Sequence, residues 1–531
     1  MKPPRVLPLG DAAVTVELGE DLDPATSARV RALDRALLSA PFDGLRETAP
    51  ALRSLLVLYD PAALGFAALR RELLSRAAEA VAVAGPVRRH QIPTRYGGED
   101  GEDLEPLARS LAIAPAELVR RHASIDYTAL MLGFTPGFPY LGLLPGGLVV
   151  PRLATPRVRV PAGSVGLAGR MTGAYPVASP GGWQIVGRIS WRLFDPLRQE
   201  PARIAPGDRV RFVPTEELPD PEPAVTPPLP AGDAPVLEVI DPGLLTSVQD
   251  GGRTGWRRYG VASAGAADPH ALACANRAVG NPPAAAGLEC TLLGPTLRFL
   301  RPWRFAVAGA DLGAVLERAD LGSWPVPLGA AVLARPGNLL RFRGRVCGCR
   351  AVIALAGGLR VPAVLGSRST DLQSGFGGHG GRALRAGDTL GASDLPTSEP
   401  RGSPAEARPD RVTLRVVLGP QADHFDAETV RRFLSTAWRL RETSDRVGCR
   451  LDGPQLAHRR SAEILSDGMV PGSVQVPPDG RPILMLADAP TTGGYPKLAT
   501  VVGADLPRAA QLVPGSGEVR FEAVAVEEVQ R

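Results

Sequence analysis

The stretch Ile204-Ala-Pro-Gly-Asp-Arg-Val-Arg-Phe212 joins a tight turn to a run in which apolar and basic residues alternate, the pattern of a half-buried β-strand. Arg385-Ala-Gly-Asp388 repeats the same kind of turn before a later strand-like run. The 60 glycines and 54 prolines each make up about a tenth of the 531 residues, well above the usual roughly 7% and 5%. Frequent turns and short strands predict a mainly β chain with repeated β-barrel units.

Two proline-rich segments divide the chain. Residues 214–235 contain eight prolines among acidic and small residues, which predicts a stiff, extended linker. Residues 396–410 form a second polar, proline-rich connector. The expected domains are an N-terminal module over 1–90 and β-barrel domains over 91–213, 236–395 and 411–531.

The N-terminal module alternates strand-like and helix-like segments. Asp23-Pro24 offers an N-cap and a proline in the first helical turn. The expected elements are strands over 14–18, 54–59 and 87–92 and helices over 25–38 and 66–83. This order predicts a βαβαβ module of the ferredoxin-like kind, and therefore an α+β start to a mainly β chain.

Composition excludes several function classes. The formal charge is only +5 and aromatic residues make up 5%; basic residues form no stripe, so we expect no nucleic-acid partner. An N-terminal apolar segment and any 18-residue apolar run are missing, so we expect a cytoplasmic protein without membrane contact. Five cysteines and six histidines show neither a disulfide framework nor metal-ligand spacing, and no metal is expected.

Lysine is almost absent. Of the 60 basic side chains only Lys2 and Lys497 are lysines. Unlike arginine, a buried lysine can lose its proton near neutral pH, and its compact ammonium fits where a planar guanidinium does not. Lys497 is therefore the first catalytic candidate, although a single leftover lysine without a role is the alternative.

The same scarcity excludes ATP and biotin sites of the common kinds. A P-loop requires Gly-Lys followed by Ser or Thr, whereas Leu498 follows Lys497. Covalent biotin requires a lysine on an exposed hairpin, and no segment fits. We expect no covalently bound cofactor, and ATP or biotin, if used, must come with another polypeptide.

The densest motif of the first half is Met131-Leu-Gly-Phe-Thr-Pro-Gly-Phe-Pro-Tyr-Leu-Gly142. Its prolines, glycines and aromatics predict a rigid loop with an aromatic wall, suited to a small-molecule pocket; turn-rich barrel packing is the alternative. The substrate-binding candidates of this half are Phe134, Pro136, Gly137, Phe138, Tyr140, Arg159, Ser164, Arg170, Tyr175 and Trp183.

These motifs resemble the B subunit of 5-oxoprolinase, also called KipI or allophanate hydrolase subunit 1. The second half resembles the C subunit, also called KipA or allophanate hydrolase subunit 2, which is similar to the carboxyltransferase region of urea carboxylase and urea amidolyase. Its matching runs begin at Pro242, Gly366, Gly375, Pro471 and Thr491. The chain thus resembles a natural fusion of the B and C subunits, and the resemblance implies cyclophilin-like β-barrels.

The resemblance implies ATP-dependent opening of 5-oxo-L-proline to L-glutamate, with ATP supplied through a separate A subunit. Such chemistry needs cations for a carboxylate, amide donors for an oxyanion and a carboxylate that positions water. The catalytic candidates are Lys497, Asp488, Asp467 and Arg368. The substrate-binding candidates of this half are Gln249, Arg253, Asp268, Gln475, Thr491 and Tyr495.

Three features qualify these assignments. Family members often read Ser-Gly-Ala-Met-Asp where this chain has Ala264-Gly-Ala-Ala-Asp268, so specificity can differ. Arg253 follows two glycines and can instead cap a turn. Gln475 lies between two valines in a strand-like run, so it faces away from the core if the valines face inward.

Two other functions stay open. One is a carboxyltransferase role on urea-like or other amides, which requires a biotinylated partner. The other is a regulatory role toward a sensor histidine kinase, as the names KipI and KipA imply. For all three functions we expect the chain to self-associate. We also expect a protein partner, which is the A-type subunit of 5-oxoprolinase, a biotinylated protein or a sensor histidine kinase.

Overall fold

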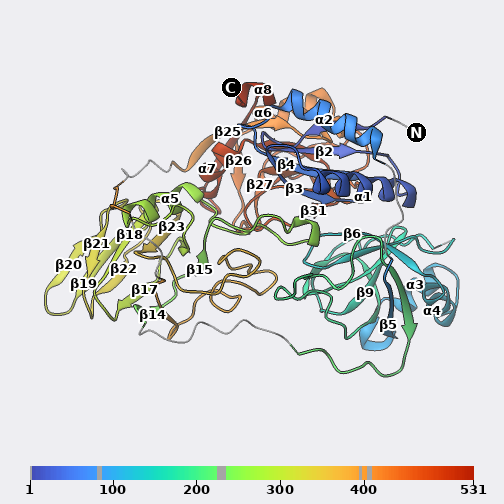
Figure 1. Ribbon diagram of the computed structural model, residues 1–531, viewed down its shortest axis with the longest axis horizontal. Coiled ribbons are helices and arrows are strands. Elements are labelled where there is room, and N and C mark those ends of the chain that lie inside the picture. Colours follow the sequence, from blue (N-terminus) through green and yellow to red (C-terminus); the bar gives the residue numbers. More distant parts are fainter. Residues whose placement is uncertain are drawn as a thin grey trace.

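The computed structural model describes residues 3–80, 87–146, 148–223, 235–393, 398–402 and 409–530. The core of the predicted linker, residues 224–234, and most of the predicted connector, residues 396–397 and 403–408, lie outside the described residues. Four folded units make up the rest (Figure 1). Among the described residues, no helix has the length and apolarity to cross a membrane.

The N-terminal unit is a four-stranded antiparallel sheet with two helices. The strands β1 (Arg5–Pro8), β2 (Ala13–Glu17), β3 (Leu45–Pro50) and β4 (Ser54–Tyr59) have the order β1-β2-β4-β3, and the helices are α1 (Pro24–Ser39) and α2 (Phe66–Glu79). Asp23 caps α1 by accepting hydrogen bonds from the backbone of Ala25 and Thr26. Leu33, Leu37 and Leu69 pack onto the sheet.

The predicted α+β module is confirmed, but its connectivity is ββαββα rather than βαβαβ. The strand expected over 87–92 is β5 (Arg89–Tyr96), which belongs to the following barrel. β1 and β3 escaped the sequence pattern because each ends in proline and carries charged residues. The last residues of the helix expected over 66–83 lie outside the described residues.

The second unit is a closed seven-stranded barrel. Besides β5, its strands are β6 (Tyr127–Leu132), β7 (Pro139–Gly142), β9 (Ser164–Ala168), β10 (Met171–Ala174), β12 (Gln184–Arg188) and β13 (Arg209–Pro214). A separate ribbon pairs β8 (Arg157–Val160) with β11 (Ser179–Gly181), and the helices are α3 (Leu104–Ser110) and α4 (Pro115–Ala123). In β13, Val210 and Phe212 face the core and Arg209 and Arg211 face outward, as the alternation predicts.

The third unit is a pair of packed sheets and not the barrel predicted for 236–395. One sheet has the order β20-β19-β22-β17-β14-β24 and the other β15-β16-β23-β18-β21. Their inner faces share one apolar core, which includes Val239, Leu288 and Phe305. A composition rich in turns is common to barrels and sandwiches, so it could not distinguish the two architectures.

The bounds of this unit's strands are β14 (Leu237–Asp241), β15 (Leu245–Gln249), β16 (Gly287–Thr291), β17 (Thr296–Phe299), β18 (Trp303–Asp311), β19 (Ala314–Arg318), β20 (Gly322–Pro325), β21 (Val332–Ala334), β22 (Leu339–Phe342), β23 (Cys347–Leu355) and β24 (Thr389–Leu390). Helix α5 (Pro269–Ala278) packs on the sheet that contains β18 and β23, through Ala271, Leu272 and Ala275.

The fourth unit is a second closed seven-stranded barrel. Its strands are β25 (Arg411–Leu418), β26 (Trp438–Leu440), β27 (Gly448–Asp452), β29 (Ser473–Gln475), β30 (Ile483–Met485), β32 (Lys497–Val501) and β33 (Glu518–Ala523). A small ribbon pairs β28 (Asp467–Gly468) with β31 (Thr492–Gly493), and the helices are α6 (Ala427–Ser435), α7 (Leu506–Ala510) and α8 (Val526–Val529). The described 3-10 helices are Gly98–Asp100, Arg257–Tyr259, Ala422–His424 and Gly503–Asp505.

The two barrels have the same topology. Numbered along the chain, the strands of each barrel follow the order 1-6-4-5-3-2-7 around the closed sheet. In each barrel the last strand runs parallel to the first, β13 beside β5 and β33 beside β25. The prediction of repeated β-barrel units is therefore confirmed for these two units.

The N-terminal sheet packs against the second barrel, although the two are at opposite ends of the sequence (Figure 1). Leu9, Ala13 and Leu56 of the sheet form one apolar cluster with Val470 of the barrel. Gln530 donates a hydrogen bond to the Tyr59 hydroxyl at 2.6 Å. The two ends of the sequence therefore lie side by side in the fold.

Candidate functional site

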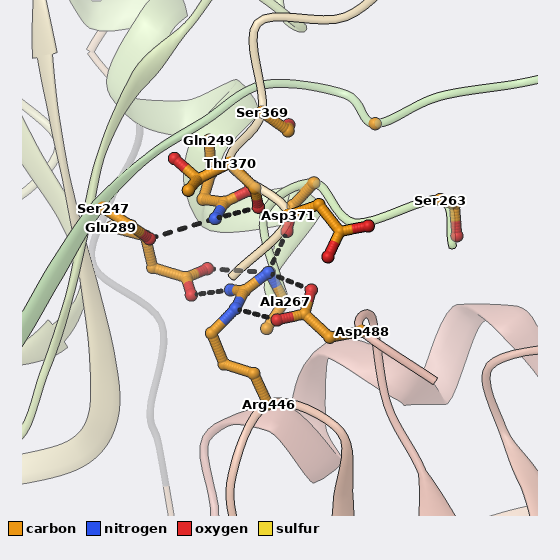
Figure 2. Close-up of polar contacts among 12 residues, drawn as sticks. Ser247, Gln249, Ser263, Ala267, Glu289, Ser369, Thr370, Asp371, Arg446 and Asp488 are labelled. Carbon is orange, nitrogen blue, oxygen red and sulfur yellow. Dashed lines mark hydrogen bonds and ion pairs between the residues drawn. The ribbon is translucent and has the colours of Figure 1, made fainter. Parts of the chain in front are cut away.

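A buried cluster of charged side chains lies between the two-sheet unit and the second barrel (Figure 2). Its centre is Arg446, in the loop before β27. The Arg446 guanidinium donates two hydrogen bonds of 2.9 Å to Asp488 and one to Glu289 of β16. It also donates to the Gly265 carbonyl oxygen at 2.7 Å. We call this set the Arg446 centre.

The charges of the Arg446 centre are held in place by their neighbours. Burial disfavours the charged guanidinium, but the carboxylates of Asp488 and Glu289 outweigh burial and raise the pKa of Arg446. The backbone N–H of Ala267 donates to the other Glu289 oxygen at 2.7 Å. The loop at which the chain departs from the family pattern, residues 264–268, therefore borders this centre directly.

Beside the Arg446 centre, three further polar side chains gather on the segment Ser369-Thr370-Asp371. Gln249 donates to the Thr370 carbonyl oxygen at 3.3 Å and to Ser247 Oγ at 3.0 Å. Arg253 donates to the carbonyl oxygens of Ser369 and of Val364. Asp371 Oδ1 accepts from the backbone N–H of Ser374 at 2.9 Å. We call Gln249, Arg253 and Asp371 the amide-facing triplet, because all three bond to backbone peptide groups of residues 364–374.

Each member of the triplet has one polar atom left over. Arg253 Nη1, Gln249 Oε1 and Asp371 Oδ2 are buried and have no hydrogen-bond partner among the described residues. These three residues are only 3%, 1% and 3% exposed, respectively. Burial, reinforced by Asp488, raises the pKa of Asp371. Unsatisfied buried polar atoms are rare in folded proteins, so three of them on neighbouring side chains mark a place where a polar ligand can bind.

A glycine-rich loop makes this arrangement possible. Gly377 has φ +73°, and a Cβ there would lie 2.3 Å from Arg253 Nη2 and 2.2 Å from the Ser369 carbonyl oxygen. Phe376 of the same loop lies under the Arg253 guanidinium, with 4.8 Å from Cζ to the ring centroid. The loop thus fixes the direction of the Arg253 side chain. Arg253 is therefore part of a buried cluster and does not only cap a turn, which was the alternative role suggested by the sequence.

Lys497 forms a second buried centre. Its Nζ donates to Asp467 Oδ2 at 2.9 Å, and the two side chains are 0% and 1% exposed. Gln421 donates to the same oxygen at 3.2 Å, and Ser54 of the N-terminal sheet donates to Asp467 Oδ1. Burial opposes ionisation of Asp467, but Lys497 and Ser54 outweigh it and hold the pKa of Asp467 below its usual range. The centre thus joins the two halves of the chain.

Three further candidates, Gln475, Thr491 and Tyr495, belong to or contact the segment that runs from Asp488 of the Arg446 centre to Lys497. Val474 and Val476 face the barrel core, so Gln475 faces outward, as its strand position predicts, and donates to the Tyr495 carbonyl oxygen at 3.4 Å. Thr491 is fully buried, and its Oγ1 has no hydrogen-bond partner among the described residues. Tyr495 is half-buried.

The predicted aromatic residues of the first half come together. The Phe138 ring meets Phe134, Tyr140, Tyr175 and Trp183 edge to face, with centroid distances of 5.1–5.8 Å. They share a core with Leu130 and Met131, which agrees with the packing alternative. Phe134 N–H donates to Thr492 Oγ1 of the second barrel at 2.9 Å, so this cluster also connects the two halves.

The other candidates are dispersed. Pro136 and Gly137 are buried in the loop before β7, and Gly137 N–H donates to the Tyr259 carbonyl oxygen at 2.7 Å. Ser164 is buried in β9, whereas Arg159 and Arg170 are exposed. Arg368 is half-buried and donates to the Val361 carbonyl oxygen at 3.1 Å.

Asp268 has a structural position. One of its oxygens accepts from Ala271 N–H at 2.8 Å as the N-cap of α5, and the other accepts from Gln511 at 2.7 Å. Both oxygens are thus engaged in holding α5 to the second barrel. The roles predicted for all these residues in substrate binding or catalysis stay predictions.

The sequence patterns missed Glu289, Asp371 and Arg446. Glu289 is a charged residue inside an otherwise apolar strand, Gly287–Thr291, which is the one local signal that could have found it. Arg446 lies among many arginines, and nothing local distinguishes it. No cluster of three or more metal-ligating side chains occurs in the described parts of the chain.

Comparison with known proteins follows the two halves. The model of the carboxyltransferase domain, subdomain C and D, matches residues 4–204, and that of subdomain A and B matches residues 259–523. The chain is 42% identical to the 5-oxoprolinase B subunit of Escherichia coli O157:H7 over 41% of this chain and 99% of that protein. It is 39% identical to the 5-oxoprolinase C subunit of Escherichia coli K12 over 55% of this chain and 93% of that protein. The chain belongs to the family of the 5-oxoprolinase B and C subunits.

Two further relatives place this fused member of the family. The crystal structure of TTHA0988 superposes with a TM-score of 0.84 at 39% identity and covers 96% of this chain and 99% of that chain. Urea amidolyase of Lachancea kluyveri is 33% identical over 52% of this chain but only 16% of that protein. About half of this chain therefore corresponds to a small part of urea amidolyase.

Proposed function

We propose that this chain is the fused B and C component of an ATP-dependent 5-oxoprolinase, which opens 5-oxo-L-proline to L-glutamate together with a separate A subunit. The observation that supports this most strongly is the pair of matches to the B and C subunits, each over nearly the whole length of the relative. ATP enters through the A subunit, since the only lysine outside the N-terminus is not part of a P-loop.

The Arg446 centre and the amide-facing triplet supply the groups that this reaction needs. Hydrolysis of a lactam places negative charge on the carbonyl oxygen, and buried, pre-oriented guanidinium groups stabilise such charge. Arg253 and Arg446 are buried and held by fixed hydrogen bonds. Asp488 and Asp371 are the carboxylates close to them, so we assign them to orienting water or the substrate nitrogen.

Lys497 and Asp467 receive a positioning role in this proposal. Lys497 is fully buried against Asp467, and its segment leads back to Thr491 and Asp488 of the site. The pair thus fixes the loop of residues 488–497. Arg368, whose backbone N–H donates to Asp250 at 2.6 Å, positions the segment that carries Asp371.

A carboxyltransferase role is the second candidate. It is favoured by the carboxyltransferase-domain models and by the similarity to urea amidolyase. This role requires a biotinylated partner, whereas the 5-oxoprolinase role requires the A subunit. The two candidate functions therefore differ in the partner protein that they require and in the substrate on which they act.

The test is glutamate release from 5-oxo-L-proline and ATP by the purified chain, with and without a homologue of the 5-oxoprolinase A subunit. We expect glutamate only in the mixture. In parallel, the chain is incubated with urea, bicarbonate, ATP and a biotin carboxylase with its carrier protein. Product in this second reaction, and none in the first, would contradict the proposal.

A further inference from the structure

The amide-facing triplet has a defined hydrogen-bonding pattern. Arg253 Nη1 can only donate and Gln249 Oε1 can only accept, whereas Asp371 Oδ2 accepts when the carboxyl is ionised and can donate when it is protonated. All three atoms are buried and unpartnered among the described residues. A ligand that satisfies them must therefore present both an acceptor oxygen and at least one N–H or O–H donor.

The charges around the triplet argue against an anion. The buried set holds the two guanidinium groups of Arg253 and Arg446 and three carboxyl groups, those of Glu289, Asp371 and Asp488. A bound carboxylate would add a further negative charge beside Asp371. It would also leave Gln249 Oε1 without a donor, which costs free energy in a buried site. A neutral group is the better match.

The three side chains converge on one short segment of the chain. Gln249 and Arg253 both bond to the backbone of Ser369-Thr370, and Asp371 follows directly. Burial raises the pKa of Asp371, and the charge of Asp488 raises it further. The charge of Arg253 lowers this pKa, but by less than burial raises it. In Figure 2 the side chains of Gln249 and Asp371 lie above the Arg446–Asp488 pair.

We propose that Gln249, Arg253 and Asp371 bind the neutral amide group of the substrate, and not its carboxylate. Arg253 Nη1 donates to the amide carbonyl oxygen, and the single N–H of the lactam is shared between the acceptors Gln249 Oε1 and Asp371 Oδ2. This assignment rests on the proposed function for the identity of the amide, 5-oxo-L-proline, but not for the chemistry of the subsite.

Calorimetric binding to the full chain, without the A subunit or ATP, tests the subsite. The ligands are 5-oxo-L-proline, its N-methyl derivative, which lacks the N–H, and urea. We expect 5-oxo-L-proline to bind at least tenfold more tightly than the N-methyl derivative, because methylation removes the donor that two buried acceptors require. Equal affinity for the two lactams would overturn the proposal.

Variants assign the effect to named atoms. Gln249→Leu removes the acceptor with little change of volume, and Arg253→Met removes the donor. We expect each to weaken binding of 5-oxo-L-proline at least tenfold, and Gln249→Leu to reduce the preference over the N-methyl derivative. Arg382→Met is the matched control, because the Arg382 guanidinium bonds to Asp388 and to the Ala383 carbonyl oxygen and, among the described residues, to no member of the triplet. Its binding should equal that of the unmodified chain.

Thermal unfolding of each variant identifies any that does not fold, and Gln249→Leu remains informative if Arg253→Met fails. Unchanged binding in a folded Gln249→Leu variant would also contradict the proposal. Binding of urea with the same dependence on Gln249, but no binding of either lactam, would support the amide subsite and count against the 5-oxoprolinase assignment. The two proposals can therefore fail separately.

Discussion

At the scale of single residues, burying the Lys497 ammonium removes its hydration, and Asp467 replaces that hydration with one charged hydrogen bond of 2.9 Å. Such a pair adds little net stability over an apolar pair, but removal of one partner leaves an uncompensated buried charge. Asp467 is then left with Ser54, Gln421 and the Gly468 N–H as donors. The pair is therefore sensitive to single substitutions and tolerant of a double one.

Lys497→Met should lower the free energy of unfolding by about 3–5 kcal/mol and abolish glutamate release with the A subunit, because the loop that carries Asp488 loses its anchor. Lys497→Met combined with Asp467→Asn should recover part of the stability. Urea denaturation measures the first effect and the coupled assay the second. The Lys497→Arg variant tests whether a positive charge alone preserves stability and activity, or whether the buried space requires the compact ammonium group. A Lys497→Met chain with normal stability and full activity would refute this account of the pair.

Sequence patterns found about half of what the structure brings together at this scale. Lys497, Asp467 and Asp488 stood out by scarcity or by family motif, and the structure places each in a buried charged cluster. Asp371 and Arg446 did not stand out, because their environment is made by segments that are distant in sequence. Burial of a charge is a tertiary property, and local composition does not report it.

At the scale of elements, helix α4 carries a histidine into the core of the first barrel. His122 Nδ1 is hydrogen-bonded to the Tyr96 hydroxyl at 2.7 Å, and His122 Nε2 to Thr172 Oγ1 at 2.9 Å. The imidazole ring stacks on the Phe212 ring, with 4.8 Å between the ring centroids. Burial lowers the pKa of His122 from 6.5 to about 3. The folded protein therefore holds this imidazole neutral, and protonation favours the unfolded chain.

The sign of the pH effect follows from this shift. Between pH 6.5 and about 3 the unfolded chain binds a proton at His122 that the folded chain does not, so the free energy of unfolding falls as the pH falls. The expected slope is about 1.4 kcal/mol per pH unit for this group. Urea denaturation at pH 7.5, 6 and 5 should show a smaller slope for His122→Asn than for the unmodified chain. Equal slopes would mean that His122 does not titrate as stated.

Elements were predicted best where the apolar pattern was regular. Helix α1 and strands β4 and β13 follow their sequence signals closely. Strand β5 was assigned to the wrong unit, because a strand pattern does not say which sheet the strand joins. Its partners β12 and β13 follow far later in the chain, and only the closed barrel shows that it belongs with them.

At the scale of the whole molecule, the N-terminal half and the second half form a continuous interface. Glu47 pairs with Arg257, Asp34 with Arg258, and Ser54 with Asp467. The Escherichia coli relatives match the two halves as separate proteins. These contacts therefore join the two halves independently of the linker.

An engineered protease site within residues 224–234 tests the strength of this interface. After cleavage the two halves should co-elute in gel filtration at micromolar concentration, because buried ion pairs and an apolar cluster join them. Glu47→Arg, which opposes Arg257, should separate the cleaved halves and leave the uncleaved chain as a single species. Separation of the cleaved halves without that substitution would contradict the prediction.

The most direct measurement for the central claim is a titration of this single chain into a fixed amount of a 5-oxoprolinase A-subunit homologue, with 5-oxo-L-proline and ATP present and with glutamate as the readout. We expect no glutamate from either protein alone, and a rate that rises with the concentration of the chain and saturates without addition of any separate B or C subunit. A rate that stays at background until a separate B or C subunit is added would show that the fused chain does not perform both parts.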